Sequence, residues 1–213
     1  MQKFLEQTET ELLIRNYSPK TRSAYLLCLK DFFSSSQFSP LPIDENRIKK
    51  FLLAKKDKGF APQTICLYLN AIKFFYKSIC HCDTDITIRF PKKNKRLPIV
   101  LSLSEILRII NAISNGKHKL LVGLAYGAGM RVSEIVRLKI KDVDLEQLTI
   151  HIKEAKGRKD RITVFPAKLK QDFMDIIAQR SRNDYVFASE RGGRLTERTA
   201  QIIFARAMQK AGI

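Results

Sequence analysis

One stretch of this sequence pairs an arginine with a carboxylate at a spacing that suits phosphate chemistry. Arg131 follows the small-residue turn Gly127-Ala-Gly129, and Glu134 comes three residues later. A guanidinium donates two parallel hydrogen bonds to a phosphate and keeps its charge throughout the physiological pH range. On a helix, a carboxylate one turn away is placed to orient that guanidinium. The pair indicates a phosphate-binding site; a surface arginine that caps a helix is the alternative that the residues alone leave open.

A second basic cluster lies between two expected strands. Residues 148–152 and 161–165 alternate between apolar and polar side chains, as half-buried strands do. The polar segment 153–160 between them predicts a hairpin turn with a basic tip. The basic residues in question are Lys156, Arg158, Lys159 and Arg161. We expect Arg158, Lys159 and Arg161 to contact phosphate, and for Lys156 a solvated hairpin tip is the alternative to a functional role.

Four helices are predicted in the N-terminal part. Apolar residues recur at helical spacing over 4–13, and Ser18-Pro19 supplies an N-cap and a first helical residue for the second helix. Asp44 caps a third helix, which Gly59 ends, and Pro62 opens a fourth. Four helices joined by short loops form a small bundle. We expect the aromatic residues of this part to fill its core rather than to stack on bases.

The C-terminal part mixes helices with the hairpin. Ser102-Leu-Ser-Glu105 matches a capping box. Further helices are expected at 120–126, 130–138, 166–180 and 196–211, with a short extended piece at 185–189. The predicted fold class is therefore mainly α with a small β-hairpin or sheet. We expect two domains, residues 1–83 and 102–213, joined by a linker over 84–101.

The charge of the chain points to a polyanionic partner. Its 213 residues carry 39 Lys and Arg against 21 Asp and Glu, a net charge of +18. The expected linker is the most basic part per residue, and its densest segment, 89–98, contains the two prolines Pro91 and Pro98. The linker cations expected to contact a nucleic-acid phosphate backbone are Lys92, Lys93, Lys95 and Arg96. An extended strap along a phosphate backbone is the functional interpretation; a solvated hinge between domains is the alternative.

Several classes of protein are disfavoured by the sequence. No apolar run approaches the roughly 20 residues that span a bilayer, and the first 25 residues lack the apolar core of a signal peptide. Cys80-His81-Cys82 resembles half of a metal site, but no second Cys/His pair follows at zinc-finger spacing. We therefore expect a cytoplasmic protein that uses no metal and no cofactor.

The motifs together resemble the tyrosine recombinases of the phage integrase family. The stretch 127–138 is similar to the family's first arginine box, and Lys156-Gly-Arg-Lys-Asp-Arg161 is similar to the hairpin motif that follows it. The segment 16–25 resembles the start of the family's N-terminal core-binding domain. The resemblance implies a four-helix, SAM-like core-binding domain and a partial α+β catalytic domain. It also implies double-stranded DNA as partner, with Lys20 and Arg22 among the contacts.

The resemblance assigns roles to the site residues and shows what is missing. It implies that Arg131 is catalytic, that Glu134 supports it, and that Lys156 protonates the leaving 5′ oxygen as a general acid. The family also uses a His-x-x-Arg box and a tyrosine nucleophile near its C-terminus. The chain has histidines only at 81, 118 and 151, none of them with Arg at the third place after it, and no tyrosine after 185. We expect a chain truncated before these groups.

The expected function is therefore that of a site-specific recombinase or integrase, here as a fragment that binds DNA but does not cleave it alone. The resemblance implies a tetrameric synapse for the full-length family enzyme, whereas we expect this fragment to be monomeric in free solution. Two alternatives remain from the sequence. One is a non-catalytic regulator derived from a recombinase, and the other is a basic helical protein that binds nucleic acid.

Overall fold

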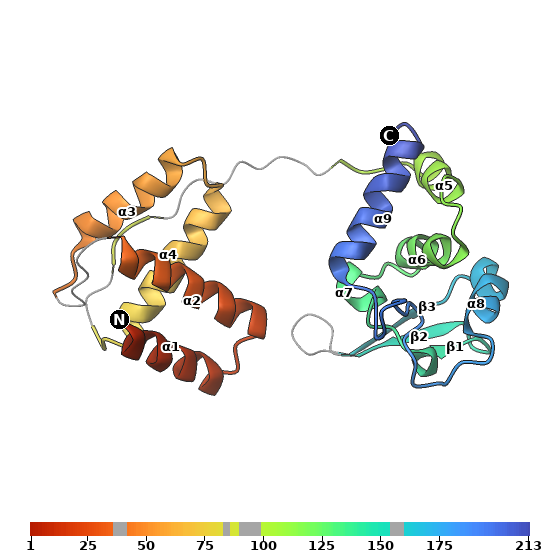
Figure 1. Cartoon of the computed structure of the whole chain (residues 1–213), viewed down its shortest axis with the longest axis horizontal. Coiled ribbons are helices and arrows are strands. Elements are labelled where there is room, and N and C mark those ends of the chain that lie inside the picture. The colour runs from red at the N-terminus through yellow and green to blue at the C-terminus, as the bar shows by residue number, and fades with distance from the viewer. Residues whose placement is uncertain (36–41, 83–85, 90–98, 154–159) are drawn as a thin grey trace. The chain divides into compact units, whose positions relative to one another are not determined.

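The computed structural model describes residues 1–35, 42–82, 86–89, 99–153 and 160–213. The chain divides into two compact units, Met1–Leu97 and Pro98–Ile213 (Figure 1). Within the described ranges, no helix is long and apolar enough to cross a membrane. The linker cations Lys92, Lys93, Lys95 and Arg96, together with Lys156, Arg158 and Lys159, lie outside the described residues.

The first unit contains the four predicted helices. They are α1 (Gln2–Ile14), α2 (Pro19–Ser34), α3 (Glu45–Asp57) and α4 (Pro62–Ser78). The predicted caps are present: the Ser18 hydroxyl accepts a hydrogen bond from the Thr21 N–H at 3.1 Å, and the Asp44 carboxylate accepts one from the Arg47 N–H at 3.0 Å. Gly59 follows α3 at φ +80°, in the left-handed region that ends helices. Local capping therefore fixes where α2 and α3 begin and where α3 ends.

Aromatic side chains fill the core of the first unit. Phe32, Phe33 and Phe75 are fully buried, and the Phe33 and Phe75 rings meet edge to face with 5.0 Å between their centroids. The prediction that such residues form the core is confirmed for these three. Tyr17 and Tyr25 differ, because they remain partly exposed and pack on each other with 6.2 Å between their ring centroids.

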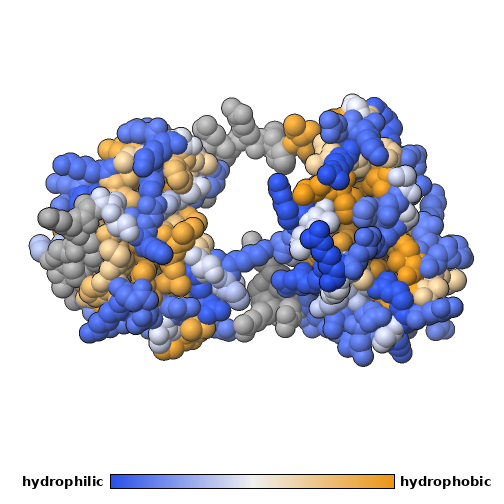
Figure 2. Space-filling model, in the orientation of Figure 1, coloured by the Kyte–Doolittle hydropathy of each residue, from blue (hydrophilic) through white to orange (hydrophobic). Residues whose placement is uncertain are grey.

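Figure 2 shows hydrophilic residues over much of the visible surface of each unit.

Part of the expected linker packs on the first unit. Ile86 is 7% exposed and belongs to the core that α2, α3 and α4 build. Beside it, the Thr87 N–H and hydroxyl both donate to the Glu45 carboxylate, at 2.6 and 3.1 Å. Residues 86–89 are therefore held against α3, so the chain leaves this unit later than residue 83.

The second unit packs its helices against one face of a small sheet. Its strands are β1 (Val143–Asp144), β2 (Thr149–Ile152) and β3 (Arg161–Val164), antiparallel in the order β1-β2-β3. Its helices are α5 (Leu103–Asn111), α6 (Gly116–Gly127), α7 (Val132–Ile135), α8 (Lys170–Ile177) and α9 (Glu197–Lys210), with short 3-10 turns at Ile140–Asp142 and Ala167–Leu169. The buried core includes Leu120, Leu124, Ile150, Phe173 and Phe187. The predicted fold class, mainly α with a small sheet, is confirmed.

Two expected elements differ from the structure. The helix predicted over 130–138 is shorter, because only Val132–Ile135 is helical before the chain turns extended. There Leu138 accepts a hydrogen bond from the Val186 N–H at 2.8 Å, and Lys139 bridges to Tyr185. This pairing with a distant segment overrides the local helical pattern. The helix predicted over 166–180 begins with a 3-10 turn, and its α-helical part ends at Ile177.

Candidate functional site

A tight turn between α6 and α7 presents Arg131. The Met130 N–H donates to the Ala125 carbonyl at 2.9 Å and closes the end of α6, while Gly129 adopts φ +59°. Gly127 has no room for a side chain, because a Cβ there would lie 2.6 Å from Cγ of Pro166. Small residues are thus required for two different reasons, one of conformation and one of close approach. The chain then enters α7 with Arg131 at its N-cap.

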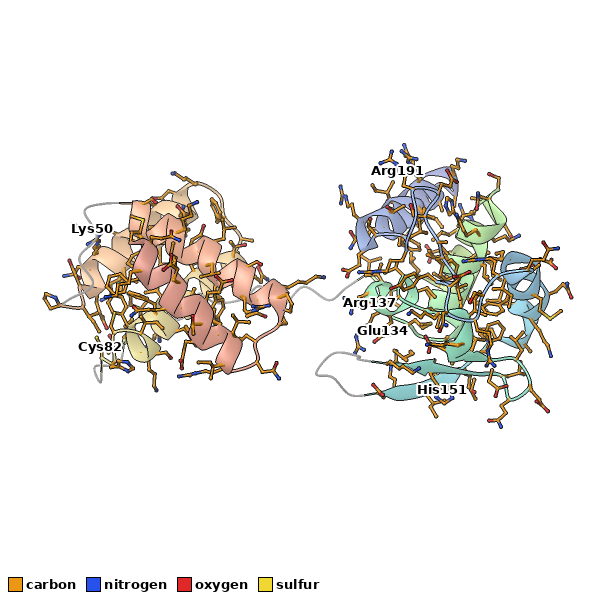
Figure 3. The ribbon with its side chains drawn as sticks, turned by 60° about the horizontal axis from the view of Figure 1, so that its bottom comes forward. Lys50, Cys82, Glu134, Arg137, His151 and Arg191 are labelled. Carbon is orange, nitrogen blue, oxygen red and sulfur yellow. The ribbon has the colours of Figure 1, made fainter. Side chains whose placement is uncertain are left out.

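Glu134 is the buried centre of the site. Its side chain is 5% exposed, and it accepts hydrogen bonds from the Arg131 N–H at 2.8 Å and from Nη1 of Arg131 at 2.7 Å. Nη2 of Arg161 donates to the same carboxylate at 2.9 Å. In Figure 3, Glu134 is labelled between Arg137, which follows α7, and His151 on β2. One carboxylate therefore joins a helix start to a strand.

The charge of Glu134 is held by these donors. Burial on its own raises the pKa of this carboxyl, but the hydrogen bonds from Arg131 and Arg161 outweigh it and keep the pKa below its usual range. The carboxylate is consequently ionised at neutral pH. The side chain of Arg131 is 56% exposed, so its guanidinium is held by Glu134 through Nη1 and is still accessible to solvent. That arrangement suits the binding of a phosphate from outside.

Strand β3 contacts the same turn through two side chains. Nη2 of Arg161 donates to the Gly129 carbonyl at 3.0 Å, and the Thr163 hydroxyl donates to the Ala128 carbonyl at 2.9 Å. Sequence reasoning singled out Arg161 but missed Thr163. The signal that could have found Thr163 is the strand alternation, which places residues 161 and 163 on one face.

The structure brings some of the candidate residues together. Arg131, Glu134 and Arg161 form one connected group, as the preceding distances show. Lys20 is exposed and Arg22 half-buried, both in the first two turns of α2 in the other unit. The remaining candidates on the linker and hairpin tip lie outside the described residues. Nothing in the described part of the chain gathers three His, Cys, Asp or Glu side chains around a metal position.

Comparison with known proteins gives a consistent result for both units. Residues 100–213 match the phage integrase family, and residues 4–86 match the phage integrase N-terminal SAM-like domain. Tyrosine recombinase XerA of Pyrococcus horikoshii is 30% identical over 213 residues, covering 98% of this chain and 73% of that protein. An integrase/recombinase of Escherichia coli is 34% identical over 175 residues, covering 78% of this chain and 50% of that protein.

A solved structure shares the fold. The structure of a lambda integrase tetramer bound to a Holliday junction has a TM-score of 0.79 at 20% identity, and the match covers 100% of this chain and 66% of that one. At this identity the likeness concerns the fold. The chain thus spans between half and about three quarters of the length of these three proteins.

Proposed function

The chain belongs to the phage integrase family of tyrosine recombinases, and on that premise we propose that it binds double-stranded DNA as a site-specific recombinase or integrase. The observation that carries the proposal is the exposed guanidinium of Arg131, held from behind by the buried carboxylate of Glu134 at 2.7 Å. A cation fixed on one edge and open on the other is preorganised for a DNA phosphate.

The residues of the site take separate roles in this proposal. Arg131 binds the phosphate at which strands are exchanged and neutralises the charge that grows on its non-bridging oxygens. Glu134 contacts Arg131 rather than DNA and is therefore a positioning residue. Lys156 would protonate the leaving 5′ oxygen, a role that rests on its place in the hairpin motif.

Further cations would hold the DNA backbone on either side of this phosphate. Lys20 and Arg22 belong to the first two turns of α2, where backbone N–H groups and the helix dipole also favour an anion. In the linker and the hairpin, Lys92, Lys93, Lys95, Arg96, Arg158 and Lys159 supply positive charge. Base readout then requires an element in the major groove, since phosphate contacts carry no sequence information.

A polypeptide of these 213 residues is expected to bind DNA without cutting it. It contains no tyrosine after Tyr185 to act as nucleophile and no His-x-x-Arg box to supply a second guanidinium. Loss of the nucleophile removes the covalent route altogether. We also expect the fragment to be monomeric in free solution and to act in the cytoplasm, on DNA.

Two measurements test this function. Affinity for a duplex should fall steeply with salt, because each contacted phosphate adds about −0.9 to the slope of log K against log salt. Incubation with a nicked suicide substrate should give no covalent protein–DNA adduct on a denaturing gel. A flat salt dependence would remove DNA binding from the proposal, and a covalent adduct would remove the claim of inactivity.

A further inference from the structure

Strand β3 contacts the arginine turn, residues 128–131 between α6 and α7, through two residues of one face. Antiparallel pairing sets Ile152 opposite Arg161 and Ile150 opposite Thr163. Both isoleucines are buried in the core of the second unit, so Arg161 and Thr163 point to the same side of the sheet. Their neighbours Ile162 and Val164 are 62% and 65% exposed on the other side. Only one face of β3 therefore reaches the turn.

The two contacts fall on consecutive carbonyl groups. The Thr163 hydroxyl donates to the carbonyl of Ala128 and Nη2 of Arg161 to that of Gly129, at 2.9 and 3.0 Å. These carbonyls lie at the end of α6, where a helix leaves its last acceptors without intrahelical partners. A shift of β3 by one residue would break both bonds and turn Arg161 away from Glu134. The pattern thus defines a single register of strand against turn.

The contacts of Arg161 also bear on its charge. The same Nη2 that contacts Gly129 donates to the buried Glu134 carboxylate at 2.9 Å, and the side chain is 37% exposed, against 56% for Arg131. Glu134 therefore pairs with two guanidiniums, of which that of Arg161 is the less exposed. Arg161 also donates to the Gly129 carbonyl, so its guanidinium makes two contacts within the protein.

We propose that Arg161 and Thr163 are positioning residues that lock the base of the β2–β3 hairpin onto the arginine turn, and that Arg161 neutralises Glu134 rather than a DNA phosphate. Residues 153–160, which include Lys156, join the two strands. Fixing the base therefore fixes both ends of the segment that carries Lys156, relative to Arg131. The role of these contacts in strand exchange rests on the proposed function, whereas the contacts themselves do not.

Amide hydrogen exchange on the 213-residue chain, without DNA, tests the lock. The N–H groups of Gly129, Met130 and Arg131 are all hydrogen-bonded and report on the turn. Thr163→Val removes one bond and should speed their exchange about fivefold, the effect of a typical hydrogen bond. Thr163→Ser keeps the hydroxyl and should restore the parent rates. Ile162→Val, on the exposed face of the same strand, is the matched control and should leave the turn unchanged.

The salt dependence of duplex binding tests the role of Arg161. If its charge serves Glu134, Arg161→Gln should leave the slope of log K against log salt at the parent value and speed exchange at the Arg131 amide. A slope smaller in magnitude by about 0.9 would make Arg161 a phosphate contact and overturn its assignment. If the amides of the turn exchange in Thr163→Val at the same rates as in the parent, Thr163 does not hold β3 on the turn and the lock is overturned. Absence of DNA binding by the parent would contradict the proposed function, and the exchange rates would still decide the lock.

Discussion

At the scale of single residues, Glu134 is the group on which the site depends. It is 5% exposed, yet it carries a charge, which is tolerated in a protein interior only when the charge is paired and hydrogen-bonded. Its donors come from both sides: Arg131 at the start of α7 and Arg161 on β3. Without this carboxylate, two guanidiniums would face each other with nothing between them. Glu134 therefore supports both the local fold and the placement of Arg131.

Replacing the carboxylate tests this role through its pH dependence. Glu134→Gln should lower the free energy of unfolding of the second unit by about 2 kcal/mol at pH 7, the range of hydrogen bonds to a charged group. Because the folded pKa of Glu134 is below its unfolded value, its contribution is present above about pH 4.3 and is lost as the pH falls through the folded pKa.

The measurement is urea unfolding followed by NMR signals of the second unit at several values between pH 7 and pH 3. The gap between Glu134→Gln and the parent should narrow as the pH falls below about 4. Glu146→Gln, at an exposed position of the turn before β2, is the control and should show little gap at any pH. A gap that stays constant from pH 7 to pH 3 would contradict an ionised Glu134.

At the scale of elements, the turn from α6 to α7 is determined by the close approach of Gly127 to Pro166. Gly127→Ala should destabilise the second unit by about 1–3 kcal/mol, the usual cost of overpacking, because the new Cβ would lie 2.6 Å from a rigid ring. Pro166→Ala removes that ring and should relieve part of the cost in the double variant. Urea unfolding of the four chains of this cycle gives the coupling energy.

Gly129 provides the comparison for this cycle. A Cβ on Gly129 meets nothing within 4 Å, and its cost arises only from φ +59°. Gly129→Ala should therefore cost about 1 kcal/mol in backbone strain, and Pro166→Ala should not relieve it. If Pro166→Ala reduced the loss of stability in both Gly127→Ala and Gly129→Ala, the turn as a whole would move, and a local clash at Gly127 would be contradicted.

Elements were predictable from the sequence where a local signal decides them. Ser18-Pro19, Asp44 and Ser102 begin helices because caps act within one turn, and the alternation of 161–165 indicates its strand. The early end of α7 was not predictable, because Leu138 pairs with Val186, far along the chain. Arg131 and Glu134 were recognisable as a pair in one motif, whereas Thr163 looks like any strand threonine until its partner at Ala128 is known.

At the scale of the whole molecule, each unit has its own core and its own share of charge. The contiguous buried cluster of the first unit comes from α2, α3, α4 and Ile86, and that of the second from residues 120–200. Positive charge is spread over the whole chain: residues 1–83 carry a net +5, residues 84–119 a net +6 and residues 120–213 a net +7. Every part of the chain therefore attracts a polyanion, and the shortest part, residues 84–119, is the most basic per residue.

The linker cations allow this distribution to be tested. If 84–101 follows the DNA backbone, replacing its four central cations by Gln should reduce the slope of log K against log salt by about three to four, since each neutralised phosphate contributes about 0.9. The substituted residues are Lys92, Lys93, Lys95 and Arg96. The slope is obtained from fluorescence anisotropy of a labelled duplex at several salt concentrations.

A matched variant separates local contact from overall charge. It replaces four exposed lysines outside the linker and so removes the same four positive charges: Lys3, Lys30, Lys170 and Lys210. Released counterions count only phosphates that cations contact directly, so this control should leave the slope near that of the parent. Equal reductions in the two variants would mean that the linker acts only through the net charge of +18, and the strap along the backbone would be excluded.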